Sequence, residues 1–319
     1  MPAQHLEQPP SQQRQKGVAL VVVLGLVAII GAWASQAAYE DMVSLRRAEN
    51  MQDAMRAVQA SQSAFAMAKQ LLRQDLRESQ QDNLDEGWAQ QTPPFPLDDG
   101  TVMGQVFDAN RYINLNDLVD DKGQVRPDEL AVMKRLFSFL ELDPGLVDAL
   151  VDWMDVDDRP YGSNGAEDAA YYDSLYRVKN VRLDRWDELR LIRGFEARVL
   201  TRLAEAVVVR SVPSGSGVTA VNINTAGKVV LMALFEKMTD VDAEAMITGR
   251  PYADVAAAIA NQPWVVGVNT ARLSVSSDVF MVRTEARFGR AVLREEYMLL
   301  RQPEKMALLT RERLAWDHL

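Results

Sequence analysis

An acidic stretch between Val151 and Tyr176 holds the residues best suited to chemistry in this sequence of 319 residues. Carboxylates that crowd one segment repel each other unless they are hydrated or a cation neutralises them. Ca²⁺ accepts six to eight oxygen ligands with tolerant geometry, so it suits such a segment. The stretch therefore predicts either an irregular calcium site or a hydrated acidic loop without metal. Its seven carboxylates are those of Asp152, Asp155, Asp157, Asp158, Glu167, Asp168 and Asp173.

Neighbouring residues predict that the acidic stretch is a loop. Pro160, Gly162 and Gly165 interrupt regular structure. The spacing does not fit an EF-hand, because the twelfth position counted from Asp155 is Ala166 rather than glutamate. Two of these carboxylates are also conceivable as the acid and base of a glycosidase. No feature of the sequence predicts that one of them is protonated while the other is ionised, as such a pair requires. We therefore expect no enzymatic activity.

Composition removes several other kinds of site. The chain has no cysteine, which excludes disulfides and thiolate metal sites, and its two histidines, His5 and His318, lie near the ends. The net charge of −10 disfavours non-specific contact with nucleic-acid phosphates and attracts hard cations. Hydrophobic residues make up 48% of the chain, which is enough for a sizeable core.

The N-terminal segment is apolar enough to cross a membrane. Val18–Ala34 contains 17 residues and no charge, and as a helix it would span roughly 26 Å. A buried soluble helix and a cleaved secretory signal are the alternatives. Arg14 and Lys16 precede the segment, while Glu40 and Asp41 follow it, which favours a cytoplasmic N-terminus. We therefore expect a single-pass inner-membrane protein whose globular part lies in the periplasm.

The junction before this segment resembles the processing site of type IV prepilins. Lys16 and Gly17 stand directly before the hydrophobic Val18. The resemblance implies that prepilin peptidase cleaves after Gly17, that the new N-terminus at Val18 is methylated, and that the apolar helix stays attached. Type IV pilins usually carry a glutamate at the fifth mature position, which is thought to pair with the subunit above. Val22 stands there instead, as in a tip subunit that has no neighbour above it.

The remaining elements predict a helical insertion between an N-terminal strand and a C-terminal sheet. Residues 36–80 contain no proline or glycine and space their apolar residues as a helix does, so the membrane segment is expected to continue into a long amphipathic helix. Strands are expected at 101–108, 275–288 and 291–300, the last two joined by a turn at Gly289. Helical spacing recurs at 127–140, 144–154, 185–206, 226–236 and 241–248.

Two Asn-x-Asn segments echo each other. Asn114-Leu115-Asn116 precedes one helical stretch, and Asn222-Ile223-Asn224 precedes another. Asparagine is a good helix N-cap because its side-chain oxygen accepts hydrogen bonds from the first free amides. Capping alone accounts for much of this pattern. A second local feature, Leu191–Gly194, is typical of a helix-hairpin-helix turn.

Together these motifs resemble the K subunit family of type II secretion systems, the largest of the minor pseudopilins. They occur in the order found in the family and cover nearly the whole chain. The acidic loop with its Gly-Ala-Glu-Asp run is the most specific of them. The matching segments are Gly17–Leu24, Ile113–Leu118, Val151–Asp158, Gly165–Tyr172, Asp187–Gly194 and Asn222–Ala226.

The resemblance implies a pilin-like α+β fold. A long N-terminal helix would pack on an antiparallel sheet, and a large all-helical domain would be inserted between the strands. The expected units are a prepilin leader (1–17), the transmembrane part of the helix (18–35), the first part of the pilin-like domain (36–112), the inserted domain (113–270), the C-terminal strands (271–302) and a C-terminal tail without a clear role (303–319).

The resemblance also implies a function and a ligand set. The family forms a ternary tip complex with the I and J minor pseudopilins, which initiates the filament and supports export of folded proteins across the outer membrane. It binds calcium in the inserted domain. The carboxylates in the matching motifs, and therefore the favoured ligands, are Asp155, Asp157, Glu167 and Asp168, with Asp152 and Asp158 in reserve.

A membrane-anchored helix-hairpin-helix DNA-binding protein is the alternative function. Asn222–Ala226 and the turn ending at Gly194 also resemble such modules, which hold phosphate through backbone amides and lysines. Lys228 and Lys237 lie near four acidic residues in this sequence, and no basic stripe is present. We therefore expect no nucleic-acid partner.

Overall fold

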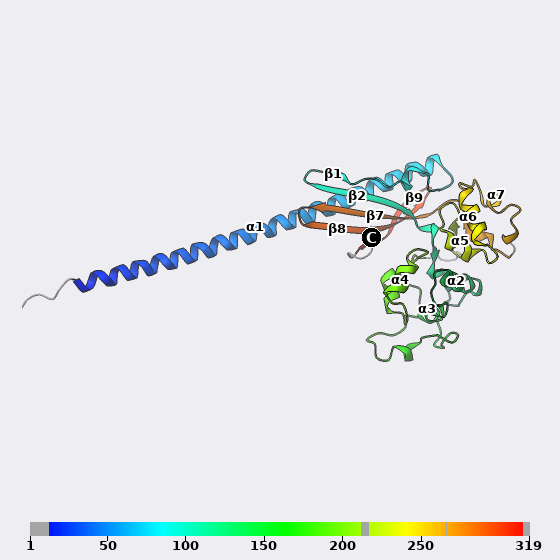
Figure 1. The fold of residues 1–319 in the computed structure, drawn as a ribbon, viewed down its shortest axis with the longest axis horizontal. Helices are drawn as coiled ribbons and strands as arrows, with labels where there is room; N and C mark the ends of the chain where they lie inside the picture. Colours follow the sequence, from blue (N-terminus) through cyan, green and yellow to red (C-terminus); the bar gives the residue numbers. More distant parts are fainter. Residues whose placement is uncertain (1–12, 212–216, 266, 315–319) are drawn as a thin grey trace, which may run out of the picture.

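The computed structural model describes residues 13–211, 217–265 and 267–314. One helix, α1 (Gln13–Glu78), extends far beyond the rest of the molecule (Figure 1). Its 66 residues span about 100 Å at 1.5 Å per residue. The helix is continuous from Gly17 through the apolar segment to the end of the amphipathic segment. This confirms the predicted continuity.

The two parts of α1 have different surroundings. In the first part, side chains such as Val21 and Ile29 are exposed to 69% and 67%, with no other element beside them. In the second part, Ala57, Ala60 and Leu72 are buried against the sheet. Small alanines allow the helix to lie close to the strands. The same helix is therefore long and apolar enough to cross a membrane at one end and is a core element at the other.

The sheet that receives α1 has five antiparallel strands in the order β1-β2-β7-β8-β9. The predicted hairpin is present, with Gly289 at a positive φ of 50° between its strands. A 3-10 helix, η1 (Gly87–Ala89), places Trp88 edge-on to Phe280 in the core that α1 forms with the sheet. The strands are β1 (Phe95–Leu97), β2 (Gly100–Asp108), β7 (Val279–Phe288), β8 (Ala291–Gln302) and β9 (Lys305–Arg313).

Strand β9 differs from the expectation that residues 303–319 form a tail. The described part of that segment pairs with β8 from Gln302–Lys305 to Glu295–Arg313. Arg311 donates to Glu295, a carboxylate that is 1% exposed beneath α1. Ser61 of α1 and Tyr297 donate to the same carboxylate at 2.6 Å. The strand therefore supplies the cation that this buried anion requires.

A helical insertion lies between β2 and β7 and forms two lobes (Figure 1). In the first lobe, the parallel pair β3–β4 closes a group of short helices. The predicted helix over 185–206 is broken, because Ile192–Glu196 is an irregular turn with Gly194 at φ 86°. The elements of this lobe follow η2 (Ala109–Arg111) and are β3 (Ile113–Asn114), η3 (Leu115–Leu118), α2 (Pro127–Phe139), α3 (Leu146–Met154), η4 (Asp168–Tyr171), η5 (Trp186–Leu191), α4 (Ala197–Leu203) and β4 (Val207–Val208).

The second lobe repeats this plan on a smaller scale. A second parallel pair, β5–β6, closes it, so the insertion extends to Ser274 rather than to the expected residue 270. One hydrophobic core, which includes Leu150 and Leu231, runs through both lobes. The elements are β5 (Val221–Asn222), α5 (Lys228–Leu234), α6 (Asp240–Thr248), α7 (Val255–Ile259), η6 (Pro263–Val265), η7 (Thr270–Arg272) and β6 (Leu273–Ser274). The predicted pilin-like α+β fold with a large, mainly helical insertion is therefore present.

Candidate metal centre

Helix α3 and the loop after it place three carboxylates together in the first lobe. Asp152 lies in the last turn of α3, Asp155 is its C-cap, and Glu167 directly precedes η4. One carboxylate oxygen of each lies within 4.8 Å of the others. The three residues are only 0%, 4% and 6% exposed, so water screens the repulsion between their charges poorly. Such a group is a candidate site for a cation that prefers oxygen ligands.

The loop returns to α3 because two glycines permit a close approach. Gly162 has a φ of 59°, which disfavours other residues. A Cβ atom at Gly165 would lie 2.5 Å from Asp152 Oδ2 and 2.5 Å from the backbone nitrogen of Tyr161. The backbone N–H groups of Tyr161 and Ala166 both donate to Asp152, the first at 2.7 Å. Asp152 therefore fixes the loop and turns Glu167 back toward Asp155.

Two oxygens of this group have no hydrogen-bond partner. Asp155 Oδ1 and Glu167 Oε1 are both buried and unbonded among the described residues. A buried acceptor without a donor costs free energy. Burial, followed by the charges of Asp157 and Asp152, raises the pKa of Asp155 to about 7. Burial and the neighbouring carboxylates also raise the pKa of Glu167 to about 7.

The donor set fits calcium. All available atoms are carboxylate oxygens, two of them need a partner, and the three negative charges would be offset by a divalent cation. Asp155, Asp152 and Glu167 would hold the ion. When bound, it would supply charge neutralisation and a fixed link between the end of α3 and the start of η4. No histidine or cysteine contributes, which is the pattern of a hard-cation site.

The structure brings together some of the predicted ligands and not others. Asp155 and Glu167 meet, and Asp152, held in reserve, joins them. Asp157 and Asp168 lie outside this group among the described residues, and both are exposed. Asp157 accepts a hydrogen bond from the backbone of Arg159, and Asp168 accepts one from Val178. Asp158 is also exposed.

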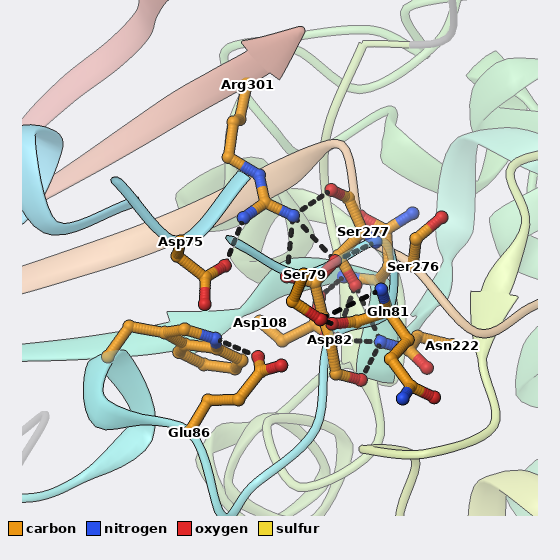
Figure 2. Close-up of polar contacts among 12 residues, drawn as sticks. Asp75, Ser79, Gln81, Asp82, Glu86, Asp108, Asn222, Ser276, Ser277 and Arg301 are labelled. Carbon is orange, nitrogen blue, oxygen red and sulfur yellow. Dashed lines mark hydrogen bonds and ion pairs between the residues drawn. The ribbon is translucent and has the colours of Figure 1, made fainter. Parts of the chain in front are cut away.

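A second acidic group lies where the insertion meets the pilin-like body. Asp75, Asp82 and Glu86 bring one oxygen each within 4.8 Å of one another. Figure 2 shows that the guanidinium of Arg301 reaches this group. It lies 2.7 Å from Asp75 and 2.6 Å from Asp82. A protein cation therefore already pairs with two members of this group, Asp75 and Asp82, whereas the described residues supply no cation inside the group at Asp155.

Buried polar contacts at this junction join the two parts of the chain. Asp108, at the end of β2, accepts from Thr225 and Ser277 at 2.5 and 2.7 Å. Asn222 of the second lobe lies within hydrogen-bond distance of Asp108, Ser277 and the backbone carbonyl of Asp82, as Figure 2 shows in part. Burial raises the pKa of Asp108 to about 6. The Asn-x-Asn segment thus ties the insertion to the body as well as capping a turn.

The processing site and the lysines of the DNA-binding alternative are also placed. Gly17 and Val18 lie within α1, and Val18 is 65% exposed. Lys228 pairs with Asp240 at 2.6 Å and with Glu244 at 3.3 Å, so its charge is offset within the second lobe. A phosphate would have to compete with two carboxylates there.

Comparisons with known proteins agree with this architecture. Two family models, both described as type II secretion system (T2SS), protein K, match residues 111–212 and 221–276. Type II secretion system protein K of Aeromonas hydrophila is 33% identical over 330 residues, covering 95% of this chain and 98% of the relative. The protein of that name from Pseudomonas aeruginosa is 34% identical over 238 residues, covering 70% of this chain and 68% of the relative.

A solved structure has the same fold. It is a chain of the crystal structure of the GspK-GspI-GspJ complex from the type 2 secretion system of enterotoxigenic Escherichia coli. The TM-score is 0.72 at 25% sequence identity, and the match covers 84% of this chain and 99% of that chain. Given the fold, the order of the motifs and these matches, the chain belongs to the type II secretion system protein K family.

Proposed function

We propose that this chain is a minor pseudopilin at the tip of the type II secretion pseudopilus. There it would initiate filament assembly and support export of folded proteins across the outer membrane. The observation that carries the proposal is α1, which is exposed and apolar in its first part and seated on the sheet in its second. Such a helix can anchor a subunit and then bundle with the helices of its neighbours, while the globular part covers the bundle.

The size and position of the insertion support a place at the tip. The insertion follows β2 and lies at the end of the sheet opposite the apolar part of α1 (Figure 1). A subunit stacked above would have to occupy the same space. Val22, where a glutamate would otherwise pair with the subunit above, points the same way.

The first part of α1 is the proposed anchor in the inner membrane, with the globular part in the periplasm. Prepilin peptidase would cleave after Gly17, and Val18 would become the methylated first residue. Mass spectrometry of the mature protein tests this directly. A chain that begins at Val18 supports the proposal, whereas one that begins beyond residue 34 would contradict it.

The I and J minor pseudopilins are the proposed partners. The related E. coli structure is that of a GspK-GspI-GspJ complex, and the fold match covers most of this chain. Co-purification of the full-length chain with I and J from detergent-solubilised membranes tests the partnership. Failure of this chain to form a complex when all three are present would overturn it.

Calcium is the proposed ligand of Asp152, Asp155 and Glu167, and its role would be structural. The buried unbonded oxygens of Asp155 and Glu167 support it. A bound cation would brace the acidic loop against α3, and no catalytic step is proposed for these carboxylates. The DNA-binding alternative gains no support, because Lys228 is already paired with carboxylates.

A further inference from the structure

A cavity lies at the neck of the insertion, where the chain leaves and rejoins the pilin-like body. Its volume of about 650 Å³ is typical of sites that hold a small organic ligand. Its wall is built from the end of α1 and the loop after it, η2, residues described between β4 and β5, the stretch from β6 to β7, and the turn between β8 and β9. Figure 2 shows three residues of this wall, Ser79, Ser277 and Arg301. A ligand in the cavity would therefore contact the insertion and the body at once.

The least compensated cation of this wall is Arg210, whose side chain is only 3% exposed. Its Nη1 atom lies 3.4 Å from Oδ1 of Asp278, the single ion pair that it makes with a described carboxylate. Asp278 is 46% exposed, so water screens much of its charge. Asp117 acts on Arg210 from beyond ion-pair distance, and the Nε atom of Arg210 has no hydrogen-bond partner among the described residues. A guanidinium fork withdrawn from water in this way can take a closer anion.

The other charges of the wall limit the ligand to one negative charge. Arg301 is already occupied, since it lies 2.7 Å from Asp75 and 2.6 Å from Asp82. Asp82 and Asp278 themselves line the cavity and would repel a second negative charge on a ligand. A phosphate dianion therefore fits poorly, whereas a monoanion can pair with Arg210.

Part of the remaining wall is apolar, which suits a ligand that carries an apolar body beside its charge. Contact between such a body and these side chains removes apolar surface from water and so favours binding. The apolar residues of the wall are Leu76, Val218, Ala220 and Pro303.

We infer that this cavity binds a monocarboxylate with an apolar body, its carboxylate paired with Arg210 and its body against the apolar wall. A planar carboxylate matches the guanidinium fork in shape and charge. A free organic acid and the carboxyl end of a peptide chain share this chemistry. Either ligand would brace the insertion against the end of α1, whether or not the chain acts at the tip of a pseudopilus.

Isothermal titration calorimetry of the full-length chain in detergent micelles, with empty micelles as the blank, tests this binding. The probes are N-acetylleucine, which has a carboxylate and an apolar body, and N-acetylleucinamide, which lacks the charge. The acid should bind more tightly than the amide by about 10-fold or more, because only the acid makes a charged hydrogen-bonded pair with Arg210. A tetrapeptide acid that ends in leucine distinguishes the two sources. Tighter binding than that of N-acetylleucine indicates a chain end, and equal or weaker binding indicates a free organic acid.

Asp278→Asn removes the competing carboxylate and leaves Arg210 in place. This variant should bind N-acetylleucine about 2- to 5-fold more tightly than wild type, the range expected for a partly exposed ion pair. Asp121→Asn is the matched control, because Asp121 is 44% exposed and pairs with Arg182 outside the cavity. Its affinity for N-acetylleucine should equal that of wild type.

Arg210→Gln should lose the preference for the acid over the amide. Its melting temperature without ligand shows whether this variant is folded, and if it is not, the comparison of Asp278→Asn with Asp121→Asn decides alone. The inference is overturned if wild type binds acid and amide equally or binds neither, or if Asp278→Asn does not bind the acid more tightly. A gain of the same size in Asp121→Asn overturns it as well, because the effect would then come from the net charge of the chain.

Discussion

Replacing Asp155 by asparagine should reverse the order of stability that calcium imposes on this chain. Without calcium, three buried carboxylates within 4.8 Å of one another oppose folding once they are ionised. The pKa of Asp155 rises from 3.8 to about 7 on folding, chiefly through burial. Because the folded state holds this proton more tightly than the unfolded state, the free energy of unfolding falls as the pH rises between those values. At pH 8 the calcium-free variant should therefore be the more stable protein.

The magnitude follows from the pKa shift. A rise from 3.8 to about 7 corresponds to at most about 4 kcal/mol. Solvent at the edge of the loop screens part of this, so Asp155→Asn should stabilise the calcium-free chain by about 1 to 2 kcal/mol. Calcium at 100 times its dissociation constant should stabilise wild type by about 2.7 kcal/mol. The variant lacks a charged ligand and should gain much less, so wild type becomes the more stable protein.

Urea unfolding of the full-length chain in detergent micelles measures both effects. Tryptophan fluorescence is a suitable signal, because Trp153 is 2% exposed and adjoins Asp152 in α3. Each protein is unfolded at pH 8 with calcium and with a calcium chelator. Asp158→Asn is the control, because Asp158 lies in the same loop, is exposed and stands outside the carboxylate group. A wild type that responds to neither additive, or a control that loses the calcium response as Asp155→Asn does, would refute this reasoning.

Three further substitutions test other parts of the molecule. Burial raises the pKa of Asp108 to about 6, so the free energy of unfolding of wild type relative to Asp108→Asn should fall by about 1 to 3 kcal/mol as the pH rises from about 4 to about 7, measured by urea titration. Gly165→Ala should lower the free energy of unfolding of the chain by about 1 to 3 kcal/mol, measured by thermal unfolding. The added Cβ would lie 2.5 Å from Asp152 Oδ2. Arg301→Met leaves buried carboxylates without their cation and should cost about 3 to 5 kcal/mol in urea, whereas Arg290→Met in the exposed hairpin turn should change little; equal effects would contradict the ion-pair account.

Local periodicity explains why much of the fold is predictable from sequence. The second part of helix α1 follows from apolar residues that recur about every 3.6 residues. The β7–β8 hairpin follows from apolar residues at every second position, with Gly289 at the turn. Strand β9 does not follow in this way, since Lys305–Arg313 is rich in charge. Its place depends on pairing with β8 and on the contact of Arg311 with the buried Glu295, which are long-range interactions.

The acidic segment was predictable from the sequence, but which of its carboxylates meet in the fold was not. The motifs of the family resemblance favoured Asp157 and Asp168, yet both side chains are exposed, whereas Asp152 is completely buried. A signal for Asp152 does exist. It stands among Val151, Trp153 and Met154 in a short helix that is apolar on nearly every side, which leaves little of the helix surface for water. The pairing of Asp152 with Glu167 needed the return path of the loop, which no local pattern gives.

The two Asn-x-Asn segments make similar contacts inside their own lobes but differ in their contact with the pilin-like body. Asn116 bonds both the N–H and the carbonyl of Leu183 at 2.8 Å, and Asn224 does the same with Tyr252 at 2.8 and 3.0 Å. Each lobe therefore has its own clamp. The preceding asparagines differ, because Asn114 bonds within the first lobe whereas Asn222 reaches the pilin-like body.

Of the two described Asn-x-Asn segments, the one in the second lobe reaches the pilin-like body, while the carboxylate group lies in the first lobe. The two residues replaced in Asp155→Asn and Arg301→Met share no hydrogen-bond partner among the described residues. Their effects on the free energy of unfolding should add to within about 0.5 kcal/mol, as for independent sites. A larger coupling in the double variant, with or without calcium, would mean that the state of the acidic loop is transmitted to the neck of the insertion, and the two regions could not then be treated as separate.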